Sequence, residues 1–167
     1  YTLYGEEKDD DKPDTKVFLT KIWYIYLAIA VSVASFVLIF SYDIVKFVTT
    51  QGYVESILTI PFLLFSQILS MGSELTGNGM TLKEQSKPYI WIMIVAAVTN
   101  FGLNFYFIPN FGFIGAAMTT IISNIIYFLS AYYWSQKVFY IKRSFIKPTL
   151  YLLIGLSIAI FFPFYEL

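Results

Sequence analysis

The sequence predicts an all-α, polytopic membrane protein, and two observations support that prediction. Hydrophobic residues make up 57% of the chain and charged residues only 13%, whereas soluble proteins contain about 45–50% apolar and about 25% charged residues. The charges are also unevenly placed. Cutting the chain at them leaves four uncharged blocks that are long enough, or nearly so, to cross a bilayer core of roughly 30 Å.

These blocks predict five membrane-spanning helices in a transmembrane helix bundle. A span needs roughly 20 predominantly apolar residues, so most of the blocks suit one helix each. The block 88–136 is the exception, because at about 1.5 Å per residue it would form a helix about 73 Å long. It must therefore fold back on itself. The predicted spans are residues 22–42, 56–73, 89–107, 113–135 and 149–165.

The long block is expected to turn at residues 108–112, Ile-Pro-Asn-Phe-Gly. Pro109 has no amide hydrogen to continue the helical ladder, and Asn110 and Gly112 tolerate turn geometry. The third and fourth spans would then form a helical hairpin. In the second span, Pro61 and Gln67 have two possible interpretations. Pro61 forms a tolerated kink while the Gln67 side-chain amide is hydrogen-bonded, or the two residues form a hinge beside a substrate path.

Two domains are predicted, a charged cytoplasmic segment at residues 1–21 and the transmembrane bundle at residues 22–167. The early run EEKDDDKPDTK lacks the spacing of a calcium loop and is too polar to bury itself. The glycine-rich run SMGSELTGNGM, residues 70–80, lacks the Walker lysine and is predicted to be part of a flexible inner loop. The chain starts without methionine, so we expect a fragment of a larger transporter.

The basic residues indicate an orientation. If the N-terminus is cytoplasmic, the inner segments are 1–21, 74–88 and 136–148, and they contain every lysine and arginine except Lys46. This is a strong positive-inside pattern. Tryptophan and tyrosine residues cluster at the same ends of the spans. The turn at residues 108–112 would then be external.

The sequence lacks the residue types on which several classes of functional site depend. The chain has no cysteine and no histidine, which removes disulfides, thiolate and imidazole metal sites, and the common nucleophile pairs. The lysines form short clusters rather than a basic stripe, so nucleic-acid binding is not expected. Asp43, Glu55 and Glu74 lie at the edges of the predicted spans, so these spans display no charged centre for an ion relay. We expect no catalytic residue, no metal and no cofactor.

Uncharged polar and small residues are patterned in the third and fourth spans. Small residues let helices approach closely, and polar ones can bond across helices at about 0.6 kcal/mol on average. Two interpretations stay open, namely packing contacts between helices or the lining of a substrate path. One row contains Ala96, Asn100 and Asn104; two adjacent rows contain Gly115, Thr119 and Ser123, and Ala116, Thr120 and Asn124. The candidate substrate-path residues are Gln67, Asn100, Asn104 and Asn124.

Residues 100–123, NFGLNFYFIPNFGFIGAAMTTIIS, resemble the signature of polysaccharide-biosynthesis flippases. The shared features are two asparagines four apart, Ile-Pro, a short turn, Gly-x-x-Gly-Ala-Ala and a threonine-containing helix. Those proteins, which include the O-antigen (Wzx-like) exporters, belong to the multidrug/oligosaccharidyl-lipid/polysaccharide (MOP) exporter superfamily. The matching positions, which the family pattern indicates are structural, are Asn100, Asn104, Pro109, Gly112, Gly115, Ala116 and Ala117.

The resemblance implies a flippase that moves undecaprenyl-pyrophosphate-linked oligosaccharide repeat units across the bacterial cytoplasmic membrane by alternating access. This chain would supply part of the second bundle of a MATE-like fold, and most basic groups for the pyrophosphate would lie in the other half. The implied partners are the lipid-linked oligosaccharide, membrane lipids, H⁺ or Na⁺ as coupling ion, and other surface-polysaccharide assembly proteins.

Other functions stay open. A MATE-type drug/cation antiporter would more often contain acidic residues within its spans. A membrane-embedded glycosyl- or acyltransferase should show histidine, acidic or arginine residues in long outer loops, whereas the outer loops predicted here, 43–55 and 108–112, are short. A membrane subunit with a purely structural role is a further alternative.

Overall fold

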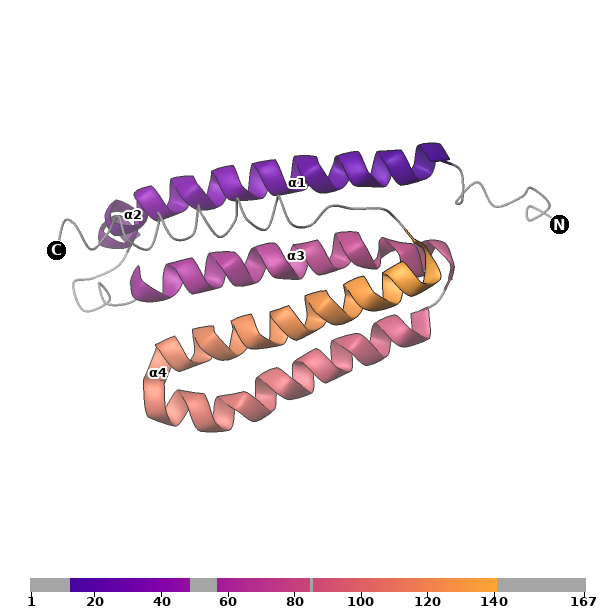
Figure 1. Cartoon of the computed structure of the whole chain (residues 1–167). Coiled ribbons are helices and arrows are strands. Elements are labelled where there is room, and N and C mark those ends of the chain that lie inside the picture. Colours follow the sequence, from indigo (N-terminus) through magenta and orange to yellow (C-terminus); the bar gives the residue numbers. More distant parts are fainter. Residues whose placement is uncertain (1–12, 49–56, 85, 141–167) are drawn as a thin grey trace.

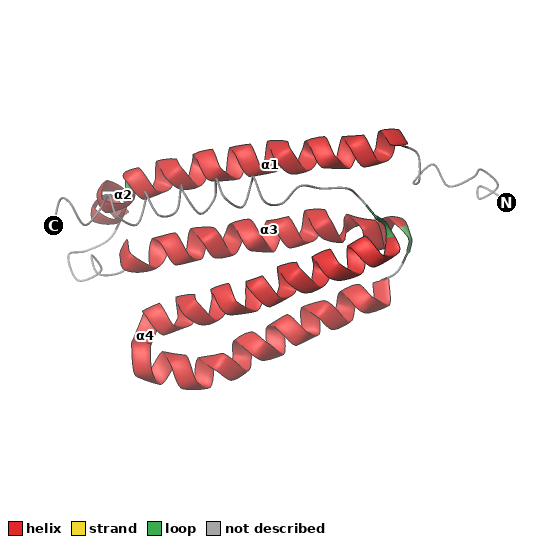
Figure 2. Ribbon diagram, viewed as in Figure 1, coloured by secondary structure: helices red, strands yellow, loops and turns green. Residues whose placement is uncertain are grey.

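The computed structural model describes residues 13–48, 57–84 and 86–140, and the regular elements within these ranges are helices (Figure 2). They are α1 (Pro13–Ile39), α2 (Ser41–Val48), α3 (Ile60–Leu82) and α4 (Ser86–Val138). In Figure 1, α1, α3 and the two arms of α4 lie side by side in the order α1, α3, second arm, first arm. Helix α3 and the second arm run in the same direction, and α1 and the first arm run in the opposite direction. The predicted all-α class is confirmed.

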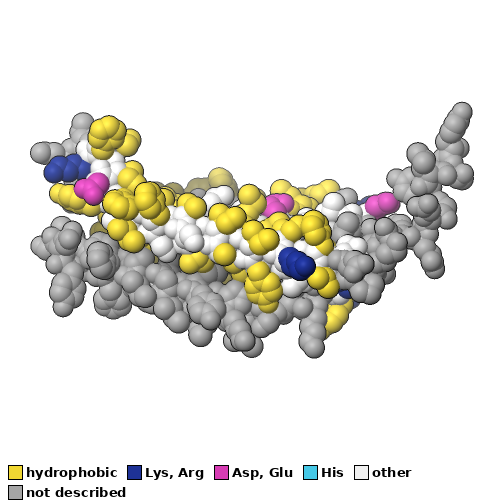
Figure 3. All heavy atoms as spheres, turned by 90° about the horizontal axis from the view of Figure 1, so that it is seen from above, with side chains coloured by type: hydrophobic (Ala, Val, Ile, Leu, Met, Phe, Trp, Pro, Cys, Tyr) yellow, Lys and Arg dark blue, Asp and Glu magenta, His cyan; other side chains and the backbone are white. Residues whose placement is uncertain are grey.

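Three helices of the described part are long and apolar enough to cross a membrane, at Thr15–Ile39, Ile57–Thr81 and Lys87–Val138. Many of their large apolar side chains are exposed, and such side chains cover much of α1 on the face seen in Figure 3. Soluble proteins rarely expose contiguous apolar surface on this scale. The helices are therefore compatible with a multi-pass membrane protein.

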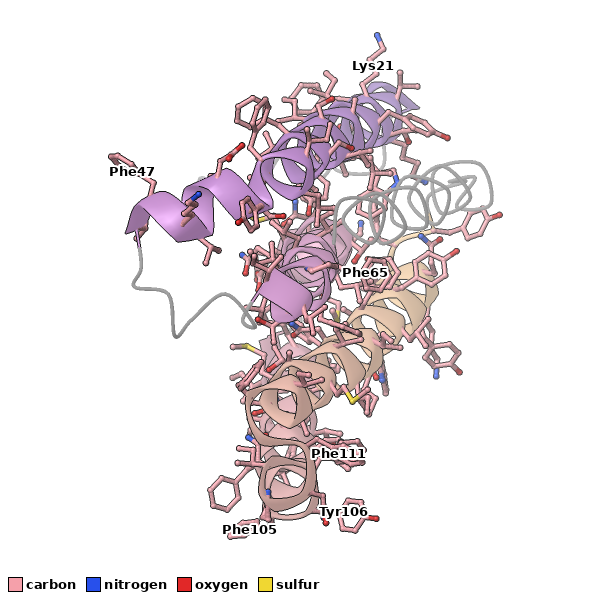
Figure 4. All side chains as sticks on the ribbon, turned by 90° about the vertical axis from the view of Figure 1, so that its left-hand side faces the viewer. Lys21, Phe47, Phe65, Phe105, Tyr106 and Phe111 are labelled. Carbon is pink, nitrogen blue, oxygen red and sulfur yellow. The ribbon has the colours of Figure 1, made fainter. Side chains whose placement is uncertain are left out.

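The first helix begins earlier than predicted, at Pro13 rather than at residue 22. The lysines before residue 22 do not prevent the helix from starting earlier, because a lysine stem can lie along apolar surface while its ammonium group stays at the edge of that surface. Lys16 does this, with its Nζ 5.1 Å from the ring centroid of Phe139. The short helix α2, which the sequence did not predict, follows α1 directly. Its Phe47 is 92% exposed and projects away from the other helices (Figure 4).

The second predicted span, 56–73, is shorter than the helix observed. Helix α3 starts at Ile60 and continues through Glu74 to Leu82, so the prediction of a flexible loop after residue 73 is wrong. Pro61 lies in the first turn of α3, where its missing N–H would have no helical partner anyway. It therefore belongs to the start of the helix and does not kink its interior.

Close packing against α4 explains why glycines do not end α3. A Cβ atom on Gly77 would lie 2.8 Å from Cε2 of Tyr89, and one on Gly79 would lie 2.5 Å from Oγ of Ser135. Both positions need the space that glycine leaves. A glycine within a helix costs about 1 kcal/mol relative to alanine, and the packing that it permits here offsets that cost.

Helix α4 is a hairpin of two arms. Its hydrogen-bonded run extends from Ser86 to Val138, but Gly112 has φ 57° and ψ −135°, and the chain reverses direction there (Figure 1). Only glycine adopts such a conformation without steric cost. The predicted fold-back is confirmed, and Gly112 is its pivot. Helical geometry continues through Pro109, beyond the predicted end at residue 107, and the side chain of Asn110 donates to the Tyr106 carbonyl at 2.6 Å.

Packing among the helices centres on α3, which makes its most extensive contacts with α4. The buried cluster Met80, Ile92, Tyr127 and Ala131 belongs to this interface. Helix α1 joins through Trp23, whose ring stacks on that of Phe128 at 6.2 Å between centroids. The Tyr26 hydroxyl also donates to the Ile68 carbonyl at 2.8 Å.

Lysines of three helices gather at one end of the bundle. Lys16 from α1 and Lys83, directly after α3, both lie over the ring of Phe139, at 5.1 and 5.4 Å from its centroid. Lys137, in the last turn of α4, lies over Trp134 at 5.2 Å. The segments that the sequence assigned to one side of the membrane therefore meet at one end. The predicted span 149–165 and most of the charged segment 1–21 lie outside the described residues.

Candidate functional site

A continuous set of side-chain hydrogen bonds joins the two arms of α4. The amide of Asn100 donates to Oγ of Ser123 at 2.9 Å, and the amide of Asn104 donates to Oδ1 of Asn100 at 3.2 Å. Oγ1 of Thr119 donates to Oδ1 of Asn104 at 2.5 Å. We call these four residues the hairpin ladder. The predicted row with Asn100 and Asn104 therefore faces the row with Thr119 and Ser123 across the hairpin.

The two arms approach most closely beside Gly115. A Cβ atom there would lie 2.2 Å from the carbonyl oxygen of Phe107 and 2.6 Å from its carbonyl carbon. These are backbone atoms, so no side-chain rotation could relieve the contact. Ala117, on the same arm, is 3% exposed, and the carbonyl of Ala116 accepts a hydrogen bond from the Thr120 hydroxyl at 2.8 Å. Together with the turn at Gly112, these positions build the closed end of the hairpin.

The remaining candidate residues lie apart from the ladder. Asn124 bonds to α3, where its amide donates to Oγ and to the carbonyl oxygen of Ser66 at 2.6 and 3.2 Å. Gln67, the next residue of α3, is exposed. The structure thus brings Asn100 and Asn104 together, joins Asn124 to a different helix, and leaves Gln67 at the surface of the described part.

A second polar cluster was not predicted from the sequence. Glu74 of α3 accepts hydrogen bonds from two tyrosines, Tyr127 at 2.8 Å to Oε1 and Tyr89 to Oε2. The two tyrosine hydroxyls also lie 2.9 Å from each other. This Glu74–tyrosine triad links α3 to both arms of α4. Tyr127 is 7% exposed, whereas Glu74 is exposed on the described surface.

One sequence signal could have revealed the triad. Small and apolar residues recur along α3 at helical spacing, at Ser66 and Ser73 within the predicted span and at Thr76 and Met80 beyond its end, and all four are buried. Such spacing indicates one continuous packed face. Ending the span at the first charge placed Glu74 in a loop, and so hid its position on a helix opposite Tyr127.

A shallow groove of about 430 Å³ opens between the two arms of α4 at the lysine-rich end. Its walls are mainly apolar, and two tryptophans contribute to them. Aromatic rings beside lysines are typical of the level at which helices leave a bilayer. The lining residues are Lys87, Pro88, Trp91, Ile92, Val95, Ser130 and Trp134.

Comparison of the chain with protein-family models, with curated proteins and with solved structures finds no match. The features that bear on function are therefore those of the chain's own residues. The two features that bear on it are the hairpin of residues 100–123 and the polar contacts that hold α3 against it.

Proposed function

We propose that the protein is a membrane transporter that flips lipid-linked oligosaccharides. Its substrate would be the undecaprenyl-pyrophosphate-linked repeat units used for surface polysaccharide biosynthesis. It would act in the bacterial cytoplasmic membrane by alternating access, with the lysine-rich end of the helices inside and the turn at Gly112 outside. Within this proposal the chain contributes five spans of a MATE-like fold and acts by moving helices rather than by chemical catalysis.

The hairpin is the observation that carries the proposal. Residues 100–123 resemble the flippase signature, and the described geometry gives the signature positions physical roles. Gly112 allows the reversal, Gly115 allows the close approach, and Asn100 and Asn104 bond across the arms. Alternating access needs helices that move as units, and two arms joined by the hairpin ladder suit such a unit.

Glu74 supports a second candidate, a drug/cation antiporter of the same superfamily. Such antiporters are expected to contain acidic residues within their spans, and Glu74 lies within a helix long enough to cross a membrane. Ionisable groups in spans are costly and usually functional. This candidate shares the architecture of the first and differs in its substrate.

Disruption of the gene in the source bacterium separates the two candidates. A flippase predicts loss of a surface polysaccharide and accumulation of its lipid-linked precursor. Normal surface glycan with altered drug sensitivity would favour the antiporter and contradict the flippase. Complementation should succeed with the wild-type gene and with Gly102→Ala, because a Cβ atom on Gly102 meets nothing within 4 Å. It should fail with Gly115→Leu.

A further inference from the structure

We propose that the groove at the lysine-rich end of α4 binds an anionic phospholipid, with the headgroup phosphate at Lys87 and the upper part of one acyl chain between the two arms. The groove measures about 430 Å³, within the range of about 300–1,000 Å³ that is usual for ligand sites. Basic pockets between membrane-spanning helices bind anionic lipid headgroups in other proteins. The groove has both the position and the size for this part of a lipid molecule.

The polarity of the first arm changes along the groove. Lys87, Trp91 and Val95 line it and follow one another at intervals of four residues, so they share one face of the helix. At about 1.5 Å per residue, Val95 lies about 12 Å along the helix axis from Lys87. The order is a cation, then an indole ring, then an aliphatic side chain. A phospholipid has the matching order of phosphate, glycerol backbone and acyl chain from the membrane surface inward.

The second arm supplies the opposite wall of the groove. The two arms are antiparallel, so the end of the second lies beside the start of the first (Figure 1). Trp134 and Ser130 line this wall, and the ammonium group of Lys137 lies 5.2 Å from the ring centroid of Trp134. The Ser130 side chain is half-buried and makes no hydrogen bond with the described residues. Its hydroxyl can therefore donate to a phosphate or ester oxygen of the lipid.

The charge of the groove favours an anionic headgroup. Its lining contains Lys87 and no acidic residue. Lys87 is exposed, and within the described part of the chain it has neither an ion pair nor a ring contact. By contrast, Lys16 and Lys83 at the same end of the bundle lie over the ring of Phe139. The ammonium group of Lys87 is therefore available to a phosphate at the membrane surface.

Quenching of tryptophan fluorescence by brominated lipids tests the proposal, because bromine quenches an indole only at short range and two tryptophans line the groove. The protein would be reconstituted in phosphatidylcholine vesicles that contain either brominated phosphatidylglycerol or brominated phosphatidylcholine. The ratio of the two apparent binding constants measures the preference for the anionic headgroup. Wild-type protein should prefer phosphatidylglycerol by about fivefold or more. Lys87→Gln should lower this preference about fivefold, which is the contribution of one lysine near an anionic surface.

Three further variants locate the site. Lys21→Gln removes the same charge from an exposed lysine of α1 that points away from the bundle (Figure 4), so it should leave the preference unchanged. Lys87→Arg retains the charge and should retain the preference. The double variant Trp91→Phe and Trp134→Phe leaves Trp23 as the remaining tryptophan of this chain. It should lose the quenching that is selective for phosphatidylglycerol.

Two results would overturn the proposal. One is a wild-type protein that shows no preference for the anionic lipid. The other is an equal loss of preference in Lys87→Gln and Lys21→Gln, which would mean that the lysines attract anionic lipid diffusely rather than at the groove. Lys87 is exposed, so its replacement leaves the packing of the helices in place. The assay contains no oligosaccharide, and its result is therefore independent of flippase function.

Discussion

Replacement of Gly115 by alanine tests the packing of the hairpin at its closest point. The added methyl carbon would lie 2.2 Å from the carbonyl oxygen of Phe107, whereas non-bonded heavy atoms prefer about 3.5–4.0 Å. The arms would have to separate by about 1 Å, which would stretch the 2.5 Å bond between Thr119 and Asn104 to the edge of hydrogen-bonding range. The change therefore affects the ladder as well as the local contact.

The expected loss of stability is about 2 kcal/mol. Overpacking costs about 1–3 kcal/mol, and a contact with rigid backbone belongs at the upper end of that range. Alanine favours the helix over glycine by about 1 kcal/mol, which offsets part of the loss. A net loss of about 2 kcal/mol changes the folded-to-unfolded ratio about 30-fold. Gly115→Leu should cost more, because its side chain must also displace the neighbouring arm.

The free energy of unfolding in mixed detergent micelles measures this effect. Gly102→Ala is the matched control, since it makes the same substitution on the first arm at a position where a Cβ atom meets nothing within 4 Å. It should be neutral or slightly stabilising. If Gly115→Ala proved as stable as Gly102→Ala, the two arms would not approach at Gly115 and the hairpin geometry would be wrong.

Three further predictions follow from the described contacts. A double-mutant cycle of Asn104→Ala and Thr119→Ala should give a coupling energy of about 0.6 kcal/mol in unfolding experiments, and additive losses would mean that the 2.5 Å contact contributes nothing. Gly79→Ala places a methyl carbon 2.5 Å from the hydroxyl oxygen of Ser135 in α4. Because that hydroxyl can rotate, we expect the free energy of unfolding to fall by only about 1 kcal/mol. An increase in this free energy would contradict close packing at Gly79. The chain has no native cysteine, so Phe111→Cys should react with an impermeant thiol reagent added outside intact cells and Thr81→Cys should not; reversed labelling would invert the proposed orientation.

The sequence predicted the parts of the fold that depend on local chemistry. A long uncharged block had to reverse direction, and the turn residues within it located the reversal, so Gly112 was anticipated as a turn residue. The spacing of Asn100 and Asn104 likewise placed them on one face of a helix. Helix periodicity alone therefore predicted a polar face on the first arm, against which the second arm could pack.

The sequence failed where tertiary packing overrides local preference. Gly77 and Gly79 favour a loop when read alone, but each makes room for a side chain of α4, and this packing keeps them helical. Glu74 appeared to end a span because charges are costly in membranes. Its tyrosine partners are distant in the sequence, so no local pattern could show that its oxygens are bonded. Pro61 was predicted to form a kink or a hinge because the first turn of α3 could not be located from hydropathy.

The central claim is that the protein moves a lipid-linked oligosaccharide across a membrane, and a translocation assay tests it most directly. The full-length protein would be reconstituted into vesicles containing undecaprenyl-pyrophosphate-linked oligosaccharide, and a membrane-impermeant glycosidase would report the fraction of sugar on the outer surface. We predict that wild-type protein makes nearly all of the sugar accessible, whereas vesicles with Gly115→Leu or without protein expose only their outer-leaflet share. Folded wild-type protein that leaves the inner-leaflet sugar protected would contradict the proposed function.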